Sequence, residues 1–233
     1  MFVGHLALGF AAKRVAPGVS LGWLVAAVVA LDLVWPVFLL AGLEQVRIEP
    51  GATAFTPLVF QSYPWSHSLL TAVAWGGVLV GIARRAGVAR SVTGLLIVLT
   101  ASHWLLDAAT HAPDLPLWPG PSPRVGLGLW NSLAGTFLVE GTLWVAGLAL
   151  YLRARPLAGR GPRLAFWSFV LVTTAMWVAG PWSPPPPDPR ALAWFALAGW
   201  IVLPWAALAD RRPPQGAGRG QEDPKETGPR AGA

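Results

Sequence analysis

Long apolar segments almost free of charge divide this chain and restrict what it can fold into. An α-helix needs about 20 apolar residues to cross the hydrocarbon core of a bilayer, and only such helices or closed barrels satisfy their backbone hydrogen bonds there. Of the 233 residues, 54% are hydrophobic and 12% are charged, which is too apolar for an ordinary soluble domain. The sequence therefore predicts an all-α, polytopic membrane protein folded as a helical bundle.

Six clear transmembrane helices are predicted, together with a short hydrophobic helix at the N-terminus. The six are Leu21–Leu43, Ser66–Ala83, Ser91–Thr110, Asn131–Leu152, Leu164–Ala179 and Ala191–Leu208. The N-terminal helix, Met1–Ala16, would be about 24 Å long, so it either spans marginally or lies at the surface. Residues 1–209 are expected to form one integral membrane domain. Residues 210–233, rich in Gly, Pro and charge, are expected to be a disordered cytoplasmic tail.

The distribution of basic residues predicts the orientation of this bundle. Lys and Arg accumulate in cytoplasmic loops. Of the 17 Lys and Arg, only Arg47, Arg124 and Arg190 fall in the loops 44–64, 112–130 and 180–190, and the other 14 lie in the opposite loops and the tail. We therefore expect the first set of loops to lie outside. The bilayer is then the main partner, and the scattered basic residues do not form the single basic face that nucleic-acid binding requires.

Ionisable residues inside an apolar helix are costly, so they mark function. His103, Asp107 and His111 recur at i, i+4 and i+8 and would share one stripe of a helix that Pro113 ends, with Asp114 just beyond. The chain has no cysteine, which leaves nitrogen and oxygen as metal ligands. Two imidazoles and a carboxylate on one stripe favour a metal site.

The predicted topology brings further polar residues to the same depth. His67 enters in the first turn of its span, Asp32 lies past the midpoint of another, and His5 joins them if the first helix spans. All four histidines would then lie in the outer half of the membrane, with Glu140 deeper. Simpler interpretations stay open: His5 as a packing residue, His67 as a helix cap, Glu140 as an interhelical anchor and Asp114 as a turn residue.

These motifs resemble the YdjM-like family of inner-membrane metal-dependent hydrolases over roughly residues 1–155. The resemblance rests on Gly4-His5, an Asp in the next helix, Ser66-His67-Ser68, and the spacing of His103, Asp107 and His111. It implies a bacterial inner-membrane location and the metal ligands His5, Asp32, His67, His103, Asp107 and His111. Leu31-Asp32-Leu33-Val34 replaces the family's Pro-Asp-x-Asp, which argues against a two-metal centre.

The expected chemistry is that of a metal-dependent hydrolase. His and Asp ligands suit Zn²⁺, with Mn²⁺ or Fe²⁺ as alternatives, and such an ion lowers the pKa of a bound water to about 7. Direct ligands are expected to be His67, His103 and Asp107, with His5 and Asp32 completing or orienting the set. The candidates for acid, base or a second metal site are His111, Asp114 and Glu140.

A site near the outer boundary favours an amphiphilic substrate such as a lipid or phosphoester. The sequence has no HExxH, G-x-S-x-G or P-loop motif, so protease, serine-hydrolase and NTPase functions lack their signatures. The alternative is a non-enzymatic membrane protein, either an ion or proton transporter or a structural subunit, since intramembrane His, Asp and Glu also mark ion pathways. The oligomeric state is left open.

Overall fold

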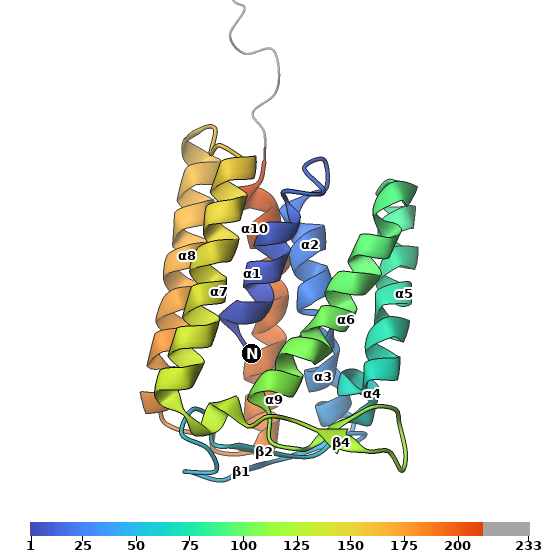
Figure 1. The fold of residues 1–233 in the computed structure, drawn as a ribbon, viewed down its shortest axis with the longest axis vertical. Helices are drawn as coiled ribbons and strands as arrows, with labels where there is room; N and C mark the ends of the chain where they lie inside the picture. Colours follow the sequence, from blue (N-terminus) through green and yellow to red (C-terminus); the bar gives the residue numbers. More distant parts are fainter. Residues whose placement is uncertain (212–233) are drawn as a thin grey trace, which may run out of the picture.

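A computed structural model describes residues 1–211 as a helical bundle with short strands at one end (Figure 1). The predicted tail is residues 210–233, and its residues 212–233 lie outside the described residues. Four helical segments within residues 1–211 are long and apolar enough to cross a membrane: Arg90–Thr110, Leu133–Ala154, Arg160–Trp182 and Pro189–Ala209. They contain α6 (Thr93–Thr110), α7 (Leu133–Ala154), α8 (Arg160–Ala179), α9 (Pro189–Leu197) and α10 (Val202–Ala209).

The prediction of six clear spans is not supported. The first predicted span is a pair of helices, α2 (Leu21–Val28) and α3 (Ala30–Leu40), bent by 55°, and counting this pair as one span gives five among the described residues. The second, α5 (Leu69–Arg85), has 17 residues. It would be about 26 Å long at 1.5 Å per residue, shorter than the roughly 30 Å hydrocarbon core.

The break between α2 and α3 lies at Val29, which has φ −114° and ψ 9°. Val28 is the last residue of α2, and the final carbonyls of a helix have no partner within it. Pro36 lies inside α3, seven positions further on, so the bend is not a proline kink. The break leaves a backbone carbonyl available in the bundle interior.

The N-terminal helix is an internal element. It is α1 (Val3–Ala12), and at 10 residues, or about 15 Å, it is too short to cross a bilayer. Figure 1 shows it between α7 and α2, and Leu6 and Phe10 are fully buried. Gly147 of α7 permits this packing, because a Cβ there would stand 2.4 Å from the carbonyl oxygen of Ala7. The expectation of a marginal span or a surface helix is therefore wrong.

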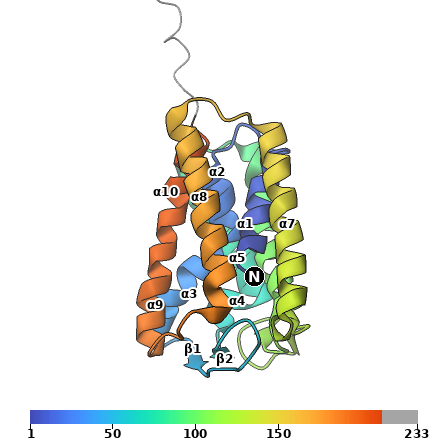
Figure 2. The same cartoon turned by 90° about the vertical axis from the view of Figure 1, so that its left-hand side faces the viewer.

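The end of the bundle that carries the strands forms a cap. An antiparallel hairpin pairs β1 (Gln45–Ile48) with β2 (Leu58–Ser62), so the segment expected to be only a polar loop is partly ordered as strands. The four-residue helix α4 (Pro64–His67) follows directly, and β3 (Leu115–Pro116) pairs with β4 (Arg124–Val125). Figure 2 shows the hairpin lying across the ends of the helices.

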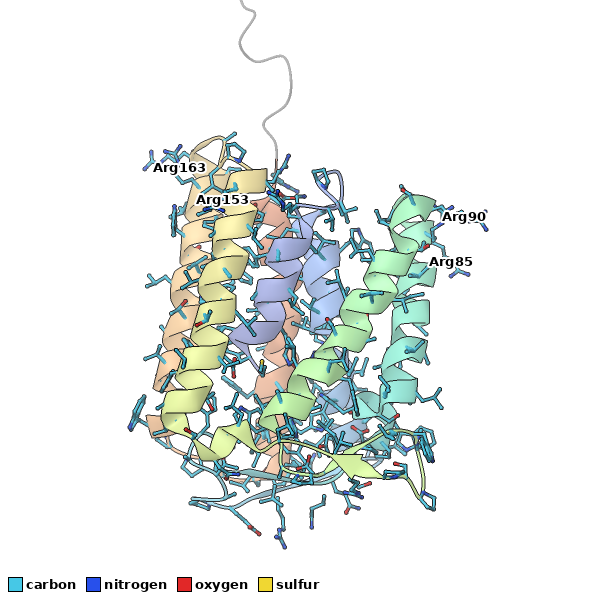
Figure 3. All side chains as sticks on the ribbon, viewed as in Figure 1. Arg85, Arg90, Arg153 and Arg163 are labelled. Atoms are coloured by element: carbon cyan, nitrogen blue, oxygen red, sulfur yellow. The ribbon has the colours of Figure 1, made fainter. Side chains whose placement is uncertain are left out.

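The opposite end of the bundle carries basic side chains. Figure 3 shows Arg85 and Arg90 beside the ends of α5 and α6, and Arg153 and Arg163 beside those of α7 and α8. Helix α6 begins at this basic end, so its last two turns, which carry His103 and Asp107, lie in the half of the bundle nearer the cap.

Candidate metal centre

Four elements bring histidine and aspartate side chains together in the cap half of the bundle. The residues are His5 from α1, Asp32 from α3, His67 from α4, and His103 and Asp107 from α6. Two groups have ligand atoms within 4.8 Å of one another: His5, His103 and Asp107, and Asp32, His67 and His103. Four of the five side chains are buried: His5, His67, His103 and Asp107. The fifth, Asp32, is 47% exposed. The structure thus brings together five of the six predicted metal ligands.

The carboxylate of Asp32 faces two imidazoles. Its Oδ1 lies 3.5 Å from Nε2 of His67 and 3.7 Å from Nε2 of His103. Ligands of a tetrahedral zinc ion, at 2.0–2.1 Å from the metal, stand about 3.3 Å apart. These separations are close to that value and longer than direct hydrogen bonds, so the three atoms are spaced as ligands around an ion would be.

The two oxygens of Asp107 have different neighbours. Oδ2 lies 3.1 Å from Nε2 of His103 and 3.8 Å from Nε2 of His67. Oδ1 lies 3.0 Å from Nε2 of His5 and accepts a hydrogen bond of 2.5 Å from the amino group of Met1. Oδ1 is therefore occupied by hydrogen bonds, whereas Oδ2 faces the same imidazoles as Asp32.

The contact between His103 and the backbone leaves Nε2 of this ring available to a cation. Nδ1 lies 2.7 Å from the carbonyl oxygen of Val28, which only accepts, so this nitrogen carries the proton. In the neutral ring Nε2 then holds a lone pair, and this buried atom makes no hydrogen bond, although Oδ2 of Asp107 lies 3.1 Å away. An unpaired buried acceptor is costly unless something binds it. Among the described residues, this atom is the clearest sign that the donor set fits a metal ion.

His67 is oriented through a neighbour that sequence reasoning missed. Its Nδ1 lies 2.7 Å from Oγ of Ser66, which in turn lies 2.6 Å from Oε2 of Glu44. Oε1 of Glu44 also accepts the backbone N–H groups of Trp65 and Ser66, both at 2.8 Å. Burial raises the pKa of the Glu44 carboxyl. No sequence pattern links Glu44 to Ser66, 22 positions later, so only the fold reveals this contact.

His5 belongs to one group of potential ligands and also packs against His103 of the other group. Its ring stacks on that of His103 with 3.7 Å between centroids and 7° between planes. Its Nδ1 is buried without a partner, while Nε2 is taken by Asp107. The geometry thus suits a residue that fixes Asp107 and His103.

Glu140, a predicted acid–base candidate, holds the start of α1. Its Oε2 accepts the backbone N–H groups of Phe2 at 2.9 Å and Gly4 at 3.3 Å, at a helix end that has no other side-chain cap. Its Oε1 is buried without a partner. Because His5 is in the first turn of α1, this contact helps to position His5.

His111 and Asp114 lie outside both groups of potential ligands. Helix α6 ends at Thr110, and His111 has an extended backbone. Only His103 and Asp107 of the three predicted residues therefore share a face of this helix. Nδ1 of His111 lies 3.2 Å from both the Tyr63 hydroxyl and Oδ1 of Asp114, and Tyr63 donates a short hydrogen bond to the same oxygen. Burial raises the pKa of the Tyr63 phenol, so it stays protonated as a donor. This cap cluster of Tyr63, His111 and Asp114 is adjacent to the centre, since the rings of Tyr63 and His67 are 5.5 Å apart.

Comparisons of the chain with protein-family models, with curated proteins and with solved structures find no match.

Proposed function

We propose that this chain is a membrane-embedded, metal-dependent hydrolase whose metal ligands are Asp32, His67, His103 and Asp107. The observation that carries the proposal is the buried Nε2 of His103, which makes no hydrogen bond and faces carboxylate oxygens of Asp32 and Asp107 at ligand spacing. Nitrogen and oxygen donors of this kind suit Zn²⁺, with Mn²⁺ or Fe²⁺ as alternatives. A family relationship to the YdjM-like hydrolases would agree with this donor set and remains part of the proposal.

A bound divalent cation would supply a nucleophile at neutral pH by acidifying water, and would polarise the bond to be cleaved. The protein's own residues prepare that chemistry. His5 holds Oδ1 of Asp107 so that Oδ2 faces the centre. Val28 and Ser66 fix the rings of His103 and His67. The cap cluster offers protonatable groups beside the centre, and we assign His111 and Asp114 to proton transfer.

The location favours an amphiphilic substrate, either a lipid or a lipid-linked phosphoester. The centre lies among helices apolar enough to span a membrane, yet in the half of the bundle nearer the polar cap. Asp32 is its half-exposed member and marks the side that a substrate would approach. With the arginine-rich end in the cytoplasm, as basic loops prefer, the centre faces the outside of the bacterial inner membrane.

The test is hydrolysis of lipid phosphomonoesters and phosphodiesters in mixed micelles by the Zn²⁺-loaded protein. His103→Ala and Asp107→Ala are expected to lower the rate more than about 100-fold, since losing even a supporting residue of a metal site typically costs 10–100-fold. Asp188→Asn is the control, because Asp188 is exposed and caps α9. Equal rates in the two site variants and the wild type would refute the hydrolase.

A further inference from the structure

We propose that Glu44 and Ser66 are positioning residues that hold His67 in the one tautomer able to bind a metal through Nε2. The inference rests on the proposed metal centre and adds residues to it that do not touch the ion. Three atoms carry it: Oε2 of Glu44, Oγ of Ser66 and Nδ1 of His67, joined by contacts of 2.6 and 2.7 Å. We call this chain of contacts the Glu44 relay.

The direction of the hydrogen bonds in the relay follows from what each group can donate. Oε1 of Glu44 accepts two backbone N–H groups, which favours the ionised carboxylate against the opposing effect of burial. An ionised carboxylate only accepts, so the single hydroxyl proton of Ser66 goes to Glu44. The remaining lone pairs of Oγ then face Nδ1 of His67, which must donate to them. A neutral imidazole with its proton on Nδ1 has its lone pair on Nε2. That nitrogen is the one facing Asp32 and Asp107 at 3.5 and 3.8 Å.

The position of Glu44 is fixed independently of His67. Glu44 is buried, and Oε1 accepts the backbone N–H groups of Trp65 and Ser66 at the start of α4. A helix of four residues has no internal partners for these groups, so the carboxylate satisfies them from a distant part of the chain. Oε1 is therefore committed to the backbone, and Oε2 is left to act on Ser66. Oε1 of Glu44 therefore stabilises the start of α4, and Oε2 acts on His67 through Ser66.

This separation makes Glu44→Gln a sharp test. The amide oxygen would keep the two backbone hydrogen bonds and α4, while the NH₂ group would take the place of Oε2. An NH₂ group donates, so Ser66 would accept from it and donate its own proton to Nδ1 of His67. The proton of the imidazole would move to Nε2, which could no longer bind a cation. Ser66→Ala only removes the relay and leaves the tautomer free. We therefore expect Glu44→Gln to be the more damaging variant, although it is nearly isosteric.

The experiment measures Zn²⁺ affinity of the full-length, detergent-purified protein by competition with a chromophoric chelator at pH 8. The tautomer of His67 is read from side-chain ¹⁵N shifts in metal-free protein. We expect about 10–100-fold weaker binding in Glu44→Gln, the size typical of supporting residues, with the proton on Nε2. A smaller loss is expected in Ser66→Ala.

Two controls match these variants. Glu49→Gln removes a carboxylate from the same segment, but Glu49 is 45% exposed and pairs with Arg47. Ser68→Ala removes a buried serine two positions further on, whose hydroxyl caps α5 at Thr71. Both should bind Zn²⁺ as the wild type does.

The outcomes separate the relay from the metal centre. Wild-type protein that binds Zn²⁺, with equal affinity in Glu44→Gln and Glu49→Gln, would overturn the relay and leave the centre standing. Wild-type protein that binds no Zn²⁺ would overturn the proposed function and the ligand role of His67 together. Weaker binding in Glu44→Gln with Nδ1 still protonated would also overturn the relay, because the loss would then have another cause.

Discussion

At the scale of single residues, the centre depends on two imidazoles whose Nδ1 atoms already have partners. His103 donates to the carbonyl of Val28, which is available because α2 ends there, and in the proposed relay His67 donates to Ser66. Each ring therefore presents Nε2 to the same two carboxylates. Supporting contacts of this kind orient metal ligands and are as much a part of a metal site as the ligands themselves.

The cap cluster should contribute stability without holding the metal. Tyr63→Phe removes the donor that Tyr63 gives to Asp114, leaving a partly buried carboxylate with only His111 as a partner. The expected loss is about 1.5–3 kcal/mol of unfolding free energy, the contribution of a hydrogen bond to a charged group. It would be measured as a lower midpoint of thermal unfolding in detergent. Zn²⁺ content should be unchanged, and loss of the metal in this variant would place the cap cluster in the centre.

The sequence predicted part of this cluster of side chains, and physical reasons explain why it missed the rest. The i, i+4 spacing correctly placed His103 and Asp107 on one face of a helix, and depth arguments brought Asp32 and His67 to them. The same argument reached His5 only by treating the first helix as a span, which its 10 residues do not allow. The same helical spacing failed for His111, because α6 ends one residue earlier. The partners Glu44 and Val28 could not be predicted, since their contacts with His67 and His103 depend on a hairpin cap and on a helix break.

At the scale of elements, α1 is the part of the fold that the sequence misjudged most. A 10-residue apolar helix looks like a short span, but here it is surrounded by other helices. Glu140 satisfies its first N–H groups, and Gly147 lets α7 approach its backbone. Hydrophobicity alone cannot tell a buried helix from one facing lipid, because both present apolar side chains all round.

Close packing of α1 against α7 predicts that Gly147→Ala is strongly destabilising. A Cβ at Gly147 would stand 2.4 Å from the carbonyl oxygen of Ala7 and 2.7 Å from its Cα, and backbone atoms cannot move aside cheaply. We expect a loss of about 1–3 kcal/mol, as in other overpacked cores.

Gly77→Ala is the matched control, because Gly77 is an exposed helical glycine of α5 with open space around it. Alanine there should be neutral or stabilising by up to about 1 kcal/mol. Thermal unfolding of both variants gives the comparison, and an equal effect would contradict this packing.

At the scale of the whole molecule, the two ends of the bundle differ in charge and in polar contacts. Arginines gather at one end (Figure 3). At the same end a buried cluster ties distant elements together. Lys13, after α1, hydrogen-bonds Asp210, after α10, and Arg155, after α7, lies 3.1 Å from the same carboxylate. The other end carries the strands and the candidate centre. The proposed orientation puts the arginine-rich end in the cytoplasm, where basic residues accumulate.

Labelling of introduced cysteines tests that orientation, and the chain offers a clean background because it has no cysteine of its own. Ser183→Cys, exposed beyond α8 near the cap, should react with a membrane-impermeant maleimide in intact cells. Ala86→Cys, exposed at the arginine-rich end, should react only after the membrane is permeabilised. The reverse pattern would place the centre on the cytoplasmic side.

The most direct test of the central claim is the metal content of the detergent-purified protein, measured by elemental mass spectrometry. His103 has one available nitrogen and belongs to both groups of ligands, so we expect about one divalent ion per chain. The ion should be lost in His103→Ala and retained in Asp114→Asn, whose side chain lies in the cap cluster. No metal in the wild type after incubation with Zn²⁺, or equal content in His103→Ala, would contradict the metal centre.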